Sequence, residues 1–158
     1  MNIETFRQYC LSFDGAMEKL PFEKATSQYD KDLLVFYVAD KWFCFVNIDK
    51  FDFCDLKCDP EESKELQVKY QGIKPGYHMN KKHWISASFN SDVPDLIIKE
   101  LVEKSYNMIV KSLPIKVQQT LKDKKSEFEV EKEKYKEQLR LQIQQAEMQA
   151  RNMRNKKF

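Results

Sequence analysis

The chain has 158 residues, of which 42% are hydrophobic and 33% are charged. This composition fits one folded domain with an appendage, and it excludes a chain that is disordered throughout or embedded in a membrane. No apolar run approaches the roughly 20 residues that a membrane-spanning helix needs. The first residues lack the basic and apolar regions of a signal peptide, so we expect a cytoplasmic protein.

Charge is distributed unevenly along the chain, although the net charge is only +2. Residues 1–113 carry 15 basic and 18 acidic side chains, a net charge of −3. Residues 114–158 carry 12 basic and 7 acidic side chains, a net charge of +5. Any binding of a polyanion must therefore depend on a local basic patch or on the tail.

The N-terminal third predicts one helix and several strands. Asn2 is a suitable N-cap for a first helix, in which apolar residues recur at spacings of three and four. Three β-like runs follow, at residues 33–39, 42–48 and 51–58, and the first is rich in β-branched and aromatic residues. Residues 28–31 are expected to add a short preceding strand. The short connections favour an antiparallel arrangement of these strands.

The segment Asp59-Pro60-Glu61-Glu62 predicts the start of a second helix. Asp59 can cap the helix, Pro60 suits its first position, and Glu62 completes a capping box. Both glutamates would also lie at the positive end of the helix dipole. This helix should run to about Tyr70.

The remaining chain predicts a loop, a strand and two helices. Residues 71–82 have loop composition, and residues 83–89 alternate as a strand does. A helix with a broad apolar stripe should run between Pro94 and Pro114. From Pro114 to about Asn155 the composition favours one long helix. Its sparse apolar residues include two series with heptad-related spacing: Leu121, Phe128 and Tyr135, then Leu139, Ile143, Ala146, Ala150 and Met153.

Four segments, in the same order along the chain, resemble the MmcQ/YjbR family. They are FRQYCLSFDGAMEKLPF (6–22), LKCDPEES (56–63), PGYHMNKKHW (75–84) and SYNMIVKSLP (105–114). The third segment is the most specific. The resemblance implies a compact α+β domain in which helices pack on an antiparallel sheet. The family's double-wing layout has been compared with DNA-binding domains, so the resemblance also implies DNA binding.

The loop that contains PGYHMNKKHW is the first candidate site. It gathers lysines, which can contact phosphate, and aromatic rings and imidazoles, which can stack on bases. Its candidate residues are Lys74, Tyr77, His78, Asn80, Lys81, Lys82, His83 and Trp84. A purely structural role is the alternative, in which Tyr77 and Trp84 hold the loop in the core and Asn80 or His78 satisfies loop backbone groups.

The end of the tail is the second candidate site, since it carries a basic cluster of Arg151, Arg154, Lys156 and Lys157. These side chains could contact phosphates, or they could simply be solvated. The apolar series in the tail could form a weak coiled coil or dock on a second copy of the chain. A solvated helix stabilised by pairs such as Glu133–Lys136 is the alternative.

Metal binding and catalysis are not predicted. If Cys54 and Cys58 lie on one extended strand they are about 13 Å apart, too far to share a zinc ion. A thiol such as Cys10 or Cys58 paired with His78 is the only arrangement that could supply a nucleophile and a base, and both cysteines lie in core-like patterns. We expect no cofactor, no metal and no catalytic residue.

The sequence thus predicts an α+β domain at residues 1–113 and a basic helical extension at residues 114–158. The first functional hypothesis is a non-enzymatic, weakly DNA-binding protein that contacts phosphate through the basic loop and the tail. The alternative is a protein-interaction module, in which residues 121–153 pair with a protein partner or a second protomer.

Overall fold

The computed structural model describes residues 1–156, except for the side chains of residues 125–128. Phe128 and Lys157, both named above, therefore lie outside the described residues. The elements in chain order are α1 (Ile3–Leu11), β1 (Met17–Lys19), α2 (Gln28–Lys31), β2 (Leu33–Val38), β3 (Lys41–Asn47), β4 (Phe53–Lys57), α3 (Pro60–Lys69), β5 (Ile73–Pro75), β6 (Trp84–Ser88), α4 (Asp95–Ser112) and α5 (Ile115–Asn155).

The chain forms two compact units, Met1–Gln119 and Thr120–Phe158. The first turns of α5 belong to the first unit. The domain boundary expected after residue 113 stays a prediction.

The first unit is built on a six-stranded antiparallel sheet with the strand order β1-β2-β3-β4-β6-β5. This confirms the expected α+β class. The two edge strands, β1 and β5, were not predicted, because three residues carry too little pattern to be distinguished from a loop. Each becomes a strand only by pairing with its longer neighbour, β2 or β6.

Residues 28–31 were expected as a strand, and this prediction was wrong, because they form the short helix α2. The Lys31 N–H donates to the Ser27 carbonyl at 3.2 Å, closing one helical turn. The Asn47 side-chain amide, reaching over from the end of β3, donates to the Tyr29 carbonyl at 2.9 Å. The Lys31 N–H and the Tyr29 carbonyl are thus satisfied without a neighbouring strand.

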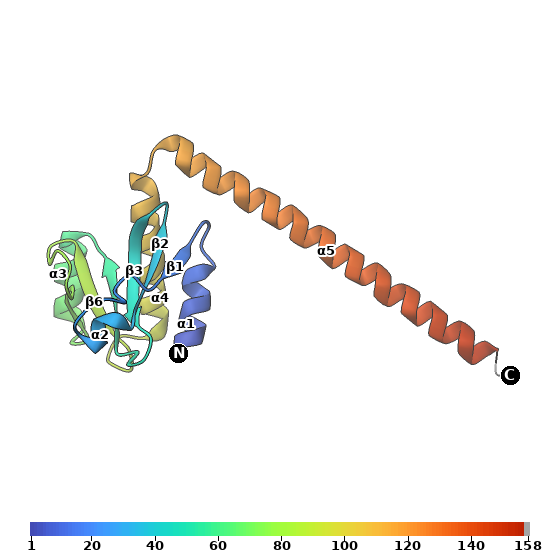
Figure 1. The fold of residues 1–158 in the computed structure, drawn as a ribbon, viewed down its shortest axis with the longest axis horizontal. Helices are drawn as coiled ribbons and strands as arrows, with labels where there is room; N and C mark the ends of the chain where they lie inside the picture. The colour runs from blue at the N-terminus through green and yellow to red at the C-terminus, as the bar shows by residue number, and fades with distance from the viewer. Residues whose placement is uncertain (157–158) are drawn as a thin grey trace. The chain divides into compact units, whose positions relative to one another are not determined.

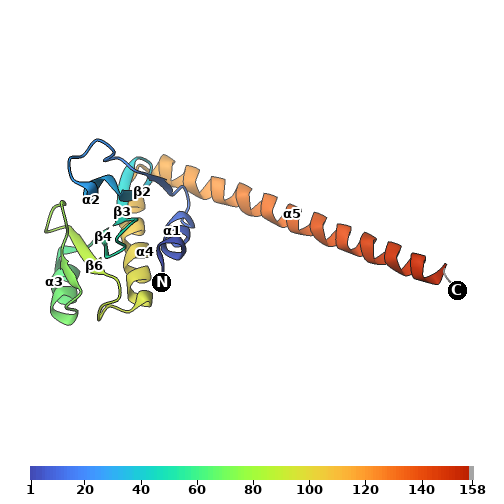
Figure 2. The ribbon, with the colours of Figure 1, turned by 60° about the horizontal axis from the view of Figure 1, so that its bottom comes forward.

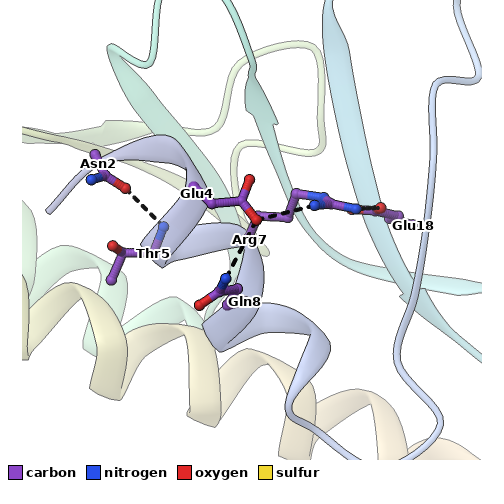
Figure 3. Close-up of polar contacts among 6 residues, drawn as sticks. All are labelled: Asn2, Glu4, Thr5, Arg7, Gln8 and Glu18. Atoms are coloured by element: carbon purple, nitrogen blue, oxygen red, sulfur yellow. Dashed lines mark hydrogen bonds and ion pairs between the residues drawn. The ribbon is translucent and has the colours of Figure 1, made fainter.

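The helix starts expected from capping residues are confirmed. The Asn2 side-chain oxygen accepts the Thr5 N–H at 2.8 Å (Figure 3). The Asp59 carboxylate accepts the N–H groups of Glu61 and Glu62 at 3.1 and 3.2 Å. In both cases a local side chain satisfies helix N–H groups that have no partner within the helix.

The start of the chain is also connected to the edge of the sheet. The Arg7 guanidinium binds both carboxylate oxygens of Glu18, with its Nε atom 2.7 Å from Oε2 (Figure 3). This two-pronged pair joins α1 to β1. Arg7 lies 3.3 Å from a carboxylate oxygen of Glu4 as well, so three charges from two elements form one small network.

Helices α1 and α4 lie side by side against the sheet in both views (Figures 1 and 2). The Tyr9 hydroxyl on α1 donates to the Lys99 carbonyl on α4 at 2.9 Å. Phe6 is fully buried, and its ring meets the rings of Phe36 and Phe89 edge to face. This face of the sheet is therefore covered by two helices through an aromatic core.

One buried hydroxyl connects α4 to two neighbouring strands. The Ser105 hydroxyl donates to the Phe43 carbonyl of β3 and accepts the Lys57 N–H of β4 at 2.9 Å. Phe43 has no partner on β2, because the register of that pair shifts between Phe36 and Tyr37. Ser105 thus satisfies a backbone carbonyl at an irregular place in the sheet.

The second unit is a single stretch of helix, as the composition predicted. Ion pairs at i,i+3 spacing run along it, including Lys136–Glu133 at 3.0 Å and Arg140–Glu137 at 3.5 Å. Its described apolar side chains include Leu139, Ile143 and Met153, which are 45%, 51% and 68% exposed. Across the described residues, no helix combines the length and the hydrophobicity required to cross a lipid bilayer.

Candidate functional site

A row of cross-strand neighbours crosses all six strands on the sheet face opposite Phe6 and Phe36. Strand register places them in sequence, one from each strand: Lys19, Val35, Phe45, Asp55, Ser86 and Lys74. Cross-strand partners present their side chains on the same face of a sheet. The row therefore has lysines at its two edge strands and a carboxyl–hydroxyl pair near its middle.

Loops and the short helix α2 cover this face. Buried Leu33, Val35 and Phe45 form its apolar cluster. The partly buried side chains that pack against this cluster come from β3, α2 and two loops: Phe22, Tyr29, Trp42, Tyr77 and Met79. The candidate loop that contains PGYHMNKKHW thus supplies part of the cover.

The candidate loop is held by its own backbone. The Gly76 N–H donates to the Trp84 carbonyl at 2.9 Å, and a Cβ on Gly76 would lie only 2.6 Å from the Trp84 Cβ. The Asn80 side chain accepts the Lys82 N–H at 2.9 Å, and the Trp84 side chain is buried. The structural role considered for Asn80 and Trp84 is therefore present in the loop.

The tip of the loop is tied to α2 by a polar cluster around Asp30. The Tyr77 hydroxyl donates to the Asp30 carboxylate at 3.2 Å, and His78 Nε2 lies 3.4 Å from the same oxygen. Partial burial and the hydrogen bond to Asp30 raise the pKa of the Tyr77 phenol. His78 adopts a left-handed backbone conformation, with φ at 57°, which costs energy for a residue with a side chain.

The first of two cavities beside the loop contains the lysines. Its volume is about 290 Å³, and its polar lining consists of the side chains of Lys74, Lys81, Ser86 and Ser88. Phe53 and Tyr77 supply aromatic walls, with their ring centroids 5.6 Å apart. The Lys81 ammonium also donates to the Gly76 carbonyl, which fixes it beside the loop. We call this space the lysine cavity.

A buried carboxyl adjoins the lysine cavity. Asp55 is the cross-strand partner of Ser86, is 0% exposed, and accepts a hydrogen bond from the Ser86 hydroxyl through Oδ1. Within the described part of the chain, Oδ2 has no hydrogen-bond partner. Burial raises the pKa of Asp55 to about 7, against the opposing effects of Ser86, the Tyr77 backbone and the Lys81 charge. Near neutral pH this carboxyl is thus partly neutral.

The second cavity has different chemistry and a volume of about 250 Å³. Its walls include the rings of Phe22, Trp42 and Phe45, and its polar groups are Asp30 and His78. We call this space the aromatic cavity. Tyr77 lines one cavity and its neighbour His78 lines the other, so the loop separates the two.

The structure brings some of the predicted site residues together and separates others. Lys74, Tyr77 and Lys81 share the lysine cavity, whereas His78 lines the aromatic cavity. The remaining members of the loop set divide into the exposed side chains of Asn80, Lys82 and His83 and the buried indole of Trp84. The tail set, Arg151, Arg154 and Lys156, is exposed and belongs to the second unit.

Sequence reasoning missed Asp30, Asp55 and Ser86. Asp55 gave one weak signal, as an acidic residue in the middle of a predicted strand that also carries Asp52 and Lys57. Such a residue is either solvent-exposed or functionally placed. Asp30 and Ser86 gave no signal, because only the tertiary fold brings them to the loop.

The cysteines are packing residues in this structure. All four are free thiols with buried side chains. Burial raises the pKa of Cys58 to about 12 and raises that of Cys44 well above its usual value. Thiolate chemistry is therefore disfavoured at both. Within the residues that the structure describes, no group of three or more His, Cys, Asp or Glu side chains is arranged to hold a metal ion.

Comparison with known proteins agrees with the sheet topology described above. The YjbR family model matches residues 11–108. The chain belongs to the YjbR family. It is 30% identical to the uncharacterized protein YjbR of Escherichia coli strain K12, over 72% of this chain and 92% of that protein. It is 35% identical to the uncharacterized protein YbdF of Escherichia coli O157:H7, over 60% of this chain and 79% of that protein.

Solved structures support the same assignment. The chain resembles a Deinococcus radiodurans protein with a DUF419 domain, with a TM-score of 0.66 and 28% identity, over 76% of this chain and 87% of that one. It also resembles a Pseudomonas syringae protein solved by crystallography, with a TM-score of 0.55 and 31% identity, over 68% and 98% of the two chains. These YjbR-family relatives establish the fold, and their names state no activity.

Proposed function

We propose that this YjbR-family protein is a non-enzymatic, weakly DNA-binding protein that contacts backbone phosphate through the lysine cavity and the basic end of the tail. The lysine cavity is the observation that carries the proposal. It combines the Lys74 and Lys81 ammonium groups with the Ser88 hydroxyl, beside the Ser86 hydroxyl that donates to Asp55. Ammonium and hydroxyl groups are common protein ligands of DNA phosphate oxygens.

The buried carboxyl does not oppose this role strongly. Asp55 lies beside Ser86, and a full negative charge there would repel a phosphate. Its pKa of about 7 means that a substantial fraction of the carboxyl is neutral at physiological pH. A phosphate bound nearby would favour the neutral form further, because two negative charges at short range repel each other.

Further basic side chains are exposed on the loop and, separately, on the tail. Lys82 and His83 are exposed on the same loop. In the second unit, Arg151, Arg154 and Lys156 are exposed over the last turns of α5. Contacts of this kind neutralise phosphate charge with little reading of base sequence, so the proposed binding is weak and strongly dependent on salt.

The test is binding of the full chain to a short DNA duplex, followed by fluorescence anisotropy at several salt concentrations. We expect Lys74→Gln/Lys81→Gln to weaken binding about tenfold at low salt and to reduce the salt slope by about two. Arg151→Gln/Arg154→Gln should have a similar effect. Glutamine removes the positive charge and keeps an N–H donor, and it is shorter than lysine by one atom.

A matched control removes the same charge elsewhere. Lys64 and Lys69 are exposed on α3, and Lys64→Gln/Lys69→Gln should leave the affinity within about twofold of the unchanged protein. The absence of binding at low salt, or an equal loss in the control, would reject the proposal.

A second candidate function has its own observation. The second unit is a single helix, and one helix cannot bury its own apolar stripe. Leu139, Ile143, Ala146, Ala150 and Met153 continue at spacings of four and three on the described part of α5. A helical partner or a second protomer that covers this stripe would make the tail a protein-interaction module.

This candidate is tested by sedimentation of the full chain. A concentration-dependent increase in mass that Leu139→Ser/Ile143→Ser abolishes would support pairing with a second protomer. Gln142→Ser/Gln145→Ser is the matched control, because it alters α5 without removing apolar residues from the stripe. A monomer at all concentrations would exclude self-pairing and leave a different protein as the partner.

A further inference from the structure

We infer that the aromatic cavity is a binding site for a compact organic cation, of the methylated ammonium class. The inference is independent of DNA binding. It depends on three features of the cavity: its aromatic walls, the carboxylate inside it, and the fixed position of that carboxylate.

The walls suit a cation with an apolar surface. The rings of Phe22 and Trp42 meet edge to face at 86°, with centroids 5.8 Å apart, so they form two sides of a box. Phe45 supplies a third ring to the lining. The negative faces of aromatic rings attract cations, and the tryptophan ring attracts them most strongly. The Trp42 ring already has one cation near its face, since the Lys19 Nζ atom lies 5.9 Å from the ring centroid.

The Asp30 carboxylate in the cavity favours a positively charged ligand. Asp30 lines the space, and its side chain is only 22% exposed. An anion would be repelled by this carboxylate. A neutral apolar ligand would further desolvate it without compensation, whereas a cation would compensate the loss of water.

The carboxylate is held in place before any ligand arrives. The Tyr77 hydroxyl and His78 Nε2 both contact Asp30 Oδ1. His78 reaches this position from a left-handed backbone conformation, and its ring lies against that of Tyr77, with centroids 4.0 Å apart. Strained backbone persists where the surrounding structure fixes it, commonly at binding sites. Preorganised groups of this kind lose little freedom on binding.

The size of the cavity limits the ligand. A volume of about 250 Å³ is slightly smaller than the pockets that hold drug-sized ligands. A trimethylammonium group with a short substituent fits this scale. Choline is therefore a suitable probe, and its uncharged carbon analogue, 3,3-dimethylbutan-1-ol, has nearly the same shape without the charge.

The experiment follows the indole N–H signals of the full chain by NMR during titration with each probe. The chain has two tryptophans, and Trp84→Phe assigns the signal of Trp42. We expect choline to shift the Trp42 signal with a dissociation constant of about a millimolar, and the carbon analogue to bind about three- to tenfold more weakly.

Two variants locate the site. Asp30→Asn should remove the preference for choline over its analogue, whereas Asp49→Asn, a change of the same kind at an exposed carboxylate, should preserve it. Equal affinity for the two probes in the unchanged protein would overturn the inference without reference to any variant. No shift of the Trp42 signal at about 50 mM choline would also overturn it.

Discussion

The two faces of the sheet bury different kinds of side chains. The helix-covered face buries Phe6, Phe36 and Phe89 beneath α1 and α4, with ring against ring. The loop-covered face buries apolar residues as well, but it also encloses Asp55 and places Asp30 beside its aromatic rings. A helix satisfies its own backbone and can cover a face with apolar side chains alone. Loops and the one-turn helix α2 bring polar groups that need partners, so cavities and charged side chains collect on this face.

The largest expected effect is on the helix-covered face. Phe6→Ala should lower the free energy of unfolding by about 3–5 kcal/mol, because it removes a fully buried ring from an aromatic cluster. Phe53→Ala, the same change at a half-buried position on the loop-covered face, should cost less than about 2 kcal/mol. Denaturant unfolding measures both. Equal losses would contradict the distinction between the faces.

Asp55→Asn should change how the free energy of unfolding depends on pH, because Asp55 is buried on the loop-covered face. The folded-state pKa of about 7 lies above the ordinary value of 3.8, so the folded protein binds the proton more tightly than the unfolded chain does. The Asp55 contribution to stability must then fall as pH rises from about 4 to about 7, and stay constant above that.

The asparagine side chain cannot ionise, so the variant should not lose stability in this way as the pH rises. Relative to the unchanged protein, its free energy of unfolding should rise across that pH window by up to about 4 kcal/mol. Unfolding by urea at pH 4 and pH 8 measures the difference. Asp49→Asn, an exposed carboxyl, serves as the control, and a pH-independent difference for Asp55→Asn would contradict a buried carboxyl with a raised pKa.

A smaller effect is expected at Ser105, on the helix-covered face. Ser105→Ala removes the bridge between the Phe43 carbonyl and the Lys57 N–H. Leaving these groups unpaired under α4 should cost about 1–3 kcal/mol. Ser112→Ala, at the exposed end of the same helix, should change stability by less than about 0.5 kcal/mol. Thermal unfolding of the two variants under identical conditions tests the contrast.

The smallest effect concerns the tie between the loop and α2. Tyr77→Phe deletes the hydroxyl that donates to Asp30. Because the pair is partly exposed, we expect a loss of about 0.5–1 kcal/mol in unfolding free energy. Hydrogen exchange of the amides of residues 76–83 should increase more than that of α4. Tyr70→Phe is the control, and faster exchange throughout the domain would mean that Tyr77 supports the core instead of the loop.

The sequence by itself determined the longer local elements and the family. Capping chemistry located the starts of α1 and α3, because a cap involves residues only two or three apart. Three β-like runs joined by short connections located β2, β3 and β4, and the absence of Gly and Pro located α5. Four short segments were enough to identify the family, which the comparison with known proteins confirmed.

Only the tertiary structure decided which charged and polar side chains lie next to one another on the sheet. Strand register brings Lys74 beside Ser86 and Ser86 beside Asp55, and register depends on residues that are tens of positions apart in the chain. The short edge strands β1 and β5, and the helical turn at α2, likewise depend on partners elsewhere. The sequence located the candidate loop. The fold decided that Lys81 and His78, three residues apart, line cavities of opposite character.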